Sequence, residues 1–111
     1  MRKILIAVAA VAGLVVGAAP ASATEHREVI GGVYATYMTF SQGNAQGSNG
    51  AVLPAIWMDR ATSRNASSWD GRLGLRTNSN WTGGLRHENY WWRTCFETQS
   101  HKILCGSWFH A

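Results

Sequence analysis

The chain has few of the residues from which active sites are built. Its 111 residues include six acidic residues, four histidines and two cysteines. The Gly-x-Ser-x-Gly turn of a serine hydrolase is absent, as is the His-Glu-x-x-His helix of a zinc protease. The histidines never recur at ligand spacing, and two cysteines without a nearby histidine cluster are not a zinc-binding set. We therefore predict a protein that is not an enzyme and that uses no metal and no cofactor.

Helical periodicity is also missing. Beyond the N-terminal segment, apolar residues do not recur every 3.6 positions, so amphipathic helices are not expected. Segments rich in β-branched and aromatic residues alternate with clusters of Gly, Ser and Asn. This pattern predicts an all-β fold of about six strands, arranged as a small antiparallel β-sandwich or a flattened barrel that contains one disulfide-linked hairpin.

The first 23 residues have the pattern of a secretory signal peptide. Met1–Lys3 is positively charged, Ile4–Ala19 is apolar, and Pro20–Ala23 ends in a small-x-small cleavage site. The apolar run is shorter than the roughly 20 residues that cross a bilayer. We therefore predict a signal peptide at 1–23 and a single secreted, extracellular β-domain at 24–111, with no membrane contact after cleavage.

The only two cysteines, Cys95 and Cys105, lie in two apolar segments separated by the polar residues 97–102. An exported protein folds in an oxidising compartment, where two thiols in one small domain are expected to be bonded. The alternation of side chains places both cysteines on one face of a hairpin within Tyr90–Phe109. We predict a Cys95–Cys105 disulfide across this hairpin.

Charge gives little support to a polyanionic partner. Loss of Arg2 and Lys3 with the signal peptide lowers the net charge from +4 to +2, so we expect no nucleic-acid binding. Most of the remaining basic residues are Arg, and they accompany six Trp. Arg and aromatic residues are enriched at protein interfaces, although the same aromatic residues could instead form the core.

Two segments are candidates for partner binding. Val29–Phe40 carries no charge and predicts one long strand, either central in the sheet or an exposed edge that pairs with a strand of another secreted protein. Its candidate contacts are Val33, Tyr34, Tyr37 and Phe40. An Arg-aromatic surface supplies four more candidates, namely Arg72, Arg76, Trp91 and Arg93. Trp81, in a polar segment, is the candidate for stacking on a carbohydrate.

The rest of the mature chain predicts its turns, loops and remaining strands. Thr24–Glu28 is expected to be a loose arm and Ser41–Gly50 a loop. Pro54 interrupts a second strand, which predicts an edge position or a bulge. Asp70-Gly71 predicts a tight hairpin turn, and Leu73 and Leu75 are expected to point inward from the strand that follows.

Several short motifs resemble a known group of proteins. They are Asp59-Arg60, the run from Ser68 through Trp69-Asp70-Gly71 to Gly74, Arg93-x-Cys95 and Cys105-x-x-Trp108. In this combination they resemble small secreted actinobacterial single-disulfide β-proteins of uncharacterised role. The turn before Trp69 is similar to a degenerate sialidase Asp box, which is a structural hairpin and implies no sialidase activity.

A looser resemblance, in size, export, the single disulfide and a long uncharged strand, is to the adaptor subunit of actinobacterial umbrella toxin particles. No residue motif carries it. It implies a protein–protein adaptor or a subunit of an extracellular complex, such as a toxin complex. The alternatives are a lectin-like carbohydrate-binding module and a small secreted ribonuclease, in which Glu88, Arg93 and His101 or His110 would be base, phosphate ligand and acid.

Overall fold

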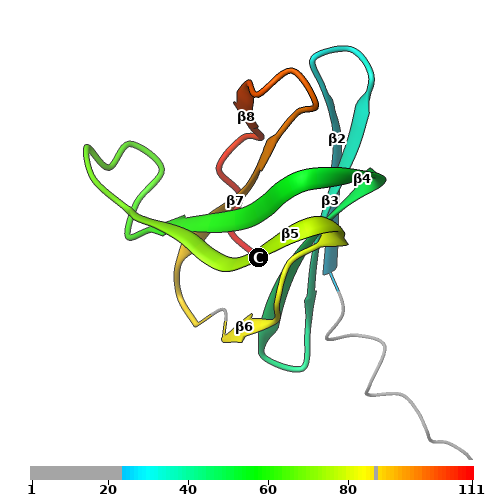
Figure 1. Ribbon diagram of the computed structural model, residues 1–111. Coiled ribbons are helices and arrows are strands. Elements are labelled where there is room, and N and C mark those ends of the chain that lie inside the picture. Colours follow the sequence, from blue (N-terminus) through cyan, green and yellow to red (C-terminus); the bar gives the residue numbers. More distant parts are fainter. Residues whose placement is uncertain (1–23, 87) are drawn as a thin grey trace, which may run out of the picture.

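A computed structural model describes residues 24–86 and 88–111, and the predicted signal peptide lies outside the described residues. The described residues contain no helix, and therefore no helix suited to crossing a membrane. They form β2 (Thr24–Ile30), β3 (Tyr34–Ser41), β4 (Asn44–Ala61), β5 (Asp70–Trp81), β6 (Leu85–Arg86), β7 (Trp91–Glu97) and β8 (Ile103–Cys105) (Figure 1). The all-β prediction is confirmed.

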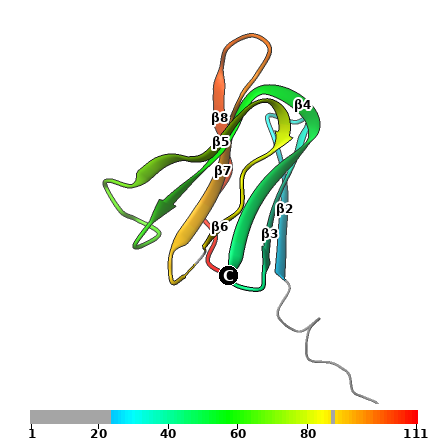
Figure 2. The same ribbon diagram turned by 60° about the horizontal axis from the view of Figure 1, so that its bottom comes forward.

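All the strand pairs are antiparallel, and the sheet is organised around the long strand β4. The sheet runs in the order β2-β3-β4-β7-β8, and β5 and β6 pair with the other side of β4. The first half of β4 pairs with β3 and its second half with β7. Figures 1 and 2 show the result, a single curled sheet that forms a half-barrel.

The change of partner along β4 falls around Pro54. Pairing with β3 ends at Asn49, and pairing with β7 starts at Ala55. The register with β5 shifts between Ser48 and Leu53 and again between Ile56 and Met58, but it is continuous from Leu53 to Ala55, so the predicted bulge does not fall at Pro54 itself. The predicted edge position is wrong, because β4 has neighbours on both sides, and Pro54 is accommodated between the stretches that pair with β3 and with β7.

The predicted strand at 29–40 is in fact a hairpin. Gly31 and Gly32 have φ of 63° and 79°, a conformation that a residue with a side chain rarely adopts, and they reverse the chain between β2 and β3. Thr24–Glu28, predicted to be a loose arm, is the first part of β2. The predicted segment therefore contributes to two strands. The first, β2, is at the end of the strand order, and the second, β3, is internal.

The predicted loop at 41–50 is also wrong. Gln42 and Gly43, with φ of 53° and 79°, make a two-residue turn, and β4 starts directly after it. The inward positions of this part of β4 include Ala45 and Gly47. A Cβ on Gly47 would lie 2.5 Å from Thr94 Oγ1 of β7, so the close packing of the two strands requires a residue without a side chain.

The start of β5 and the direction of its side chains also differ from the prediction. Asp70 and Gly71 lie within the strand, because Asp70 pairs with Arg60 of β4. Leu73 packs on the core as expected, but Leu75 is 45% exposed. Arg72 and Gly74 have φ of 58° and 64°, and these two left-handed residues interrupt the alternation of faces that the prediction assumed.

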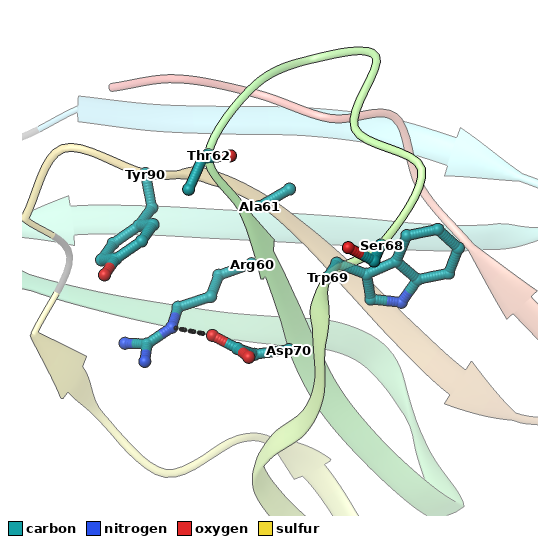
Figure 3. Close-up of a pocket in the computed structure, with 7 residues that line it drawn as sticks. All are labelled: Arg60, Ala61, Thr62, Ser68, Trp69, Asp70 and Tyr90. Carbon is teal, nitrogen blue, oxygen red and sulfur yellow. Dashed lines mark hydrogen bonds and ion pairs between the residues drawn. The ribbon is translucent and has the colours of Figure 1, made fainter.

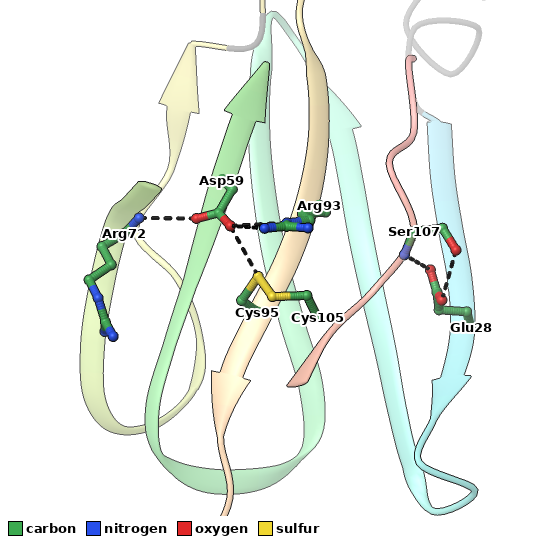
Figure 4. Close-up of a disulfide and its surroundings, with 7 residues drawn as sticks. All are labelled: Glu28, Asp59, Arg72, Arg93, Cys95, Cys105 and Ser107. Carbon is green, nitrogen blue, oxygen red and sulfur yellow. Dashed lines mark hydrogen bonds and ion pairs between the residues drawn. A yellow bond between two sulfur atoms is a disulfide. The ribbon is translucent and has the colours of Figure 1, made fainter. Parts of the chain in front are cut away.

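The core lies inside the curl of the sheet. Met38, Phe40, Met58 and Trp92 form one buried cluster, and Ile30, Leu53, Ile56 and Phe96 form another. The C-terminal segment completes the enclosure. Trp92 and Phe109 exchange two backbone hydrogen bonds of 2.8 Å, and Glu28 of β2 accepts the N–H of Ser107 at 3.0 Å. Figure 4 shows this segment beside β2. Side-chain contacts thereby link the two ends of the sheet.

Candidate functional site

The outward face of β4 and β7 carries the disulfide. Cys95 and Cys105 are directly paired across the β7–β8 hairpin and bonded to each other, which confirms the predicted disulfide. They pack with Ala55 and Trp57 of β4. A loop of this size is expected to stabilise the fold by about 3 kcal/mol, mainly through the unfolded state.

Beside the disulfide lies a buried ion pair. Asp59 is 4% exposed, and its carboxylate accepts hydrogen bonds from the Arg93 side chain at 3.0 Å and from the Arg72 backbone N–H at 3.1 Å (Figure 4). Cys95 Sγ is 3.3 Å from the same carboxylate. Because a disulfide sulfur carries no proton, we regard this as a van der Waals contact. Buried carboxylates need such partners to offset lost hydration.

Two tryptophans enclose the Arg93 guanidinium. Its carbon lies 4.6 Å from the Trp69 ring centre and 4.5 Å from that of Trp108. Trp69 ends the 62–69 loop and Trp108 belongs to the C-terminal segment. Arg93, which the sequence suggested as a partner contact, instead has a side chain that is 19% exposed and joins three parts of the fold.

The same group of atoms has no metal-binding capacity. Asp59, Cys95 and Cys105 place one potential ligand atom each within 4.8 Å of one another. The two sulfurs are bonded together, however, and only a thiolate is an effective ligand. The expectation of no metal stays a prediction for the chain as a whole.

Two other predicted residues lie near this face. The Arg72 guanidinium stacks on Trp57 at 4.2 Å and covers that ring, which is 3% exposed. Trp91 is half-buried and its ring centre is 5.4 Å from that of His110. Both side chains are thus partly engaged in the fold.

Two predicted contacts belong to the core. Phe40 is 1% exposed, and Tyr34 packs against Phe96 with ring centres 5.0 Å apart. The alternation along β3 turns both inward, so we remove them from the partner surface. Val33, in the β2–β3 turn, is 75% exposed, and Tyr37 points to the opposite, outer side of the sheet.

A row of side chains crosses this outer side. Register pairs Arg27 with Tyr37, Tyr37 with Ser48, and Ser48 with Trp81, so the four residues face the same way on four adjacent strands. The Arg27 guanidinium lies 5.6 Å from the Tyr37 ring, and that of Arg76 lies 5.2 Å from Trp81. We call these five residues, together with Val29, the outer aromatic face. Val29 is 58% exposed and Trp81 49%.

Sequence reasoning found only part of this face. It named Tyr37, Arg76 and Trp81 as separate candidates, and it missed Arg27 and Val29 as surface partners because their segment was not read as a separate strand of a hairpin. The Gly31-Gly32 dipeptide was the signal that could have identified that hairpin.

A hollow of about 220 Å³ opens where β4 enters the 62–69 loop. Its lining is mostly polar and comprises Arg60, Ala61, Thr62, Ser68, Trp69, Asp70 and Tyr90 (Figure 3). Arg60 Nε donates to Asp70 Oδ2 at 2.9 Å, and its guanidinium lies 4.6 Å from the Tyr90 ring. The hydrogen bond to Asp70 raises the pKa of Arg60 above its ordinary value.

Comparison with known proteins gives no assignment, since no family model, no curated protein and no solved structure matches the chain.

Proposed function

We propose that this protein is a non-enzymatic extracellular binding protein, an adaptor or subunit that docks another secreted protein on its outer aromatic face. The observation that carries the proposal is the cross-strand row of Arg27, Tyr37, Ser48 and Trp81, with Arg76 over the tryptophan. Arg, Tyr and Trp are the residues that most often dominate binding energy in protein interfaces. Export rests on the N-terminal pattern, and the disulfide is consistent with it.

Aliphatic side chains favour a protein over a sugar. Val29 lies two residues from Arg27 on the same face, and Val33 follows in the adjoining turn. They are 58% and 75% exposed. Exposed aliphatic groups bury well against a protein surface and add nothing to ring stacking on a sugar. The row and these valines together form the apolar centre and charged rim of a docking surface.

Docking by strand addition, the other predicted mode, has less support. The internal strand β3 is already paired on both sides. The inward side chains of β2 contact the C-terminal segment, through the Glu28–Ser107 hydrogen bond and the stack of His26 on Phe109 at 4.4 Å, so this segment lies beside the strand. We therefore propose contact through the face of the sheet.

The test is capture of the partner from the producer's culture supernatant with tagged residues 24–111. Wild-type protein should retain one larger exported protein in stoichiometric amount, and a Tyr37→Ala/Trp81→Ala double variant should not. Leu75→Ala is the matched control, because Leu75 is similarly exposed on β5 but outside the row. With the purified partner, the single substitutions Tyr37→Ala and Trp81→Ala should each weaken the Kd by at least about 30-fold, as expected of a residue that contributes 2 kcal/mol to binding. Equal capture by the double variant would exclude this face.

Carbohydrate binding is the second candidate. Tyr37 and Trp81 are two strands apart, so their backbones lie roughly 10 Å from each other, a separation that suits two rings stacking along an extended oligosaccharide. A soluble glycan that binds would raise the Tm of the wild type by mass action, and the Tm of the Tyr37→Ala/Trp81→Ala variant would stay unchanged. A protein adaptor would show no shift in either.

The ribonuclease alternative has little support from the geometry. It needs Arg93 for a phosphate, but that guanidinium is bonded to Asp59 and stacked between two tryptophans. His101 pairs with Glu97 at 2.9 Å, and His110 contacts Asn89 at 2.6 Å. Cleavage of RNA by the wild type and its loss in Glu88→Gln would revive this alternative.

A further inference from the structure

The charges of the outer aromatic face lie at its two ends. Arg27 on β2 and Arg76 on β5 each lie over an aromatic ring of the row. Between these two strands, β3 carries no charged residue, and β4 carries none before Asp59. The face therefore has a neutral, partly aromatic centre with a positive charge on each side.

The fold supplies no carboxylate to neutralise these two charges. Among residues 24–86 and 88–111, the ion pairs include neither Arg27 nor Arg76. Five of the six acidic residues pair with an arginine or a histidine elsewhere, namely Glu28, Asp59, Asp70, Glu88 and Glu97.

The sixth acidic residue, Glu25, lies on the same side of β2 as Arg27, two positions before it. Its single negative charge is smaller than the two positive charges of the arginines. The outer aromatic face therefore has a net positive charge, although the fold pairs nearly all the acidic residues of the chain internally.

This charge pattern limits what can dock there. A second copy of the chain would bring arginines towards arginines, and like charges placed across an interface cost binding energy. A neutral surface would remove water from the guanidinium groups and return no counter-charge. A surface with carboxylates around an apolar centre meets both needs, because a carboxylate accepts paired hydrogen bonds from one guanidinium.

We propose that the protein docked on the outer aromatic face presents an acidic surface to it. Its carboxylates pair with Arg27 and Arg76, and its apolar groups cover Tyr37 and Val29. The rings under the two arginines belong to strands two apart, so the carboxylates are roughly 10 Å from each other. This inference rests on the proposed docking function and adds the charge of the partner to it.

The test is surface plasmon resonance of the captured and purified exported protein on residues 24–111, at about 50 mM and about 500 mM NaCl. Salt screens exposed charges, so the Kd of the wild type should weaken about tenfold over this range. Arg27→Gln/Arg76→Gln should weaken the Kd at low salt about tenfold and remove most of the salt dependence. Arg27→Lys/Arg76→Lys keeps both charges and should keep the salt dependence.

Two further variants test the sign and the place of the effect. Glu25→Gln removes the negative charge beside Arg27, so it should tighten the Kd at low salt by about twofold to threefold. Arg64→Gln is the matched control, because it removes an arginine charge from the exposed 62–69 loop, outside the outer aromatic face. It should change the Kd by less than about twofold.

The outcomes distinguish this inference from the proposed function. Suppose that Tyr37→Ala/Trp81→Ala abolishes capture, but the wild type binds equally at both salt concentrations or Glu25→Gln weakens binding. The face then docks a protein that is not acidic, and this inference alone is wrong. Equal capture by Tyr37→Ala/Trp81→Ala, no captured protein, or release by salt of an acidic polysaccharide in place of a protein would overturn both.

Discussion

Arginine lies against aromatic rings in two regions of this protein, and its surroundings differ between them. Around Asp59, Arg93 is bonded to a buried carboxylate and enclosed by two tryptophans. On the outer aromatic face, Arg27 and Arg76 each lie over one ring, and neither is paired with a carboxylate among the described residues. We therefore expect an Arg–aromatic contact to serve binding only where an open ring and an unpaired charge remain.

The first and largest expected effect concerns the buried pair. Asp59→Ala leaves the Arg93 charge without its partner and should lower the free energy of unfolding by about 3 kcal/mol or more. Asp70→Ala is the matched control, since it breaks an Arg–Asp pair whose carboxylate side chain is 61% exposed, and it should cost less than about 1 kcal/mol. Urea denaturation followed by tryptophan fluorescence measures both. Equal losses would mean that burial does not distinguish the two pairs.

Removal of the disulfide should come next. A Cys95→Ala/Cys105→Ala variant releases a short loop and should lose about 3 kcal/mol of unfolding free energy. Thermal unfolding of the wild type with and without a reductant gives an independent measurement. If reduction leaves the Tm unchanged, the hairpin is held by its packing on Trp57 and Ala55 rather than by the bond.

Neighbouring positions on β4 test the two faces of the sheet directly. Gly47→Ala places a methyl group 2.5 Å from Thr94 Oγ1 and should cost about 1–3 kcal/mol through overpacking. Ser48→Ala, one residue further along on the outer face, should change the unfolding free energy by no more than about 0.5 kcal/mol. A comparable loss from Ser48→Ala would indicate that the outer face is itself covered in the folded protein.

The smallest effect is expected at Arg76. Arg76→Ala removes one cation–π contact on an exposed ring and should lower the unfolding free energy by less than about 1 kcal/mol. The same variant should weaken capture of the partner protein, because in the proposed function the Arg76 side chain contributes to binding rather than to folding. A loss of stability as large as that of Asp59→Ala would place Arg76 in the structural group.

Strand content was more predictable than strand boundaries. β7 was readable because Trp92, Thr94 and Phe96 alternate with Arg93 and Cys95, and the first three are buried. The start of β4 was not readable, because its inward residues are as small as Gly47 and its outward residues are polar. The absence of a side chain at Gly47 is required by Thr94, on a strand almost fifty residues away, and no local pattern records that contact.

The candidate sites were also predictable only in part, in their residues but not in how those residues come together. Tyr37 and Trp81 were each suspected from residue type, yet their alignment through Ser48 depends on the registers of two separate strand pairs. The hollow joins the 62–69 loop to Tyr90, and no spacing in the chain predicts that contact.

The sequence by itself determined the all-β class and the disulfide, because side-chain alternation and a single cysteine pair are local features with few solutions. Only the tertiary structure decided which arginines serve the fold. Arg93 was a candidate for partner binding by composition, and it became structural because Asp59, Trp69 and Trp108 converge on it from three distant segments. Burial is a property of the assembled sheet, so the same residue type has a different role in the covered and in the open part of its outer side.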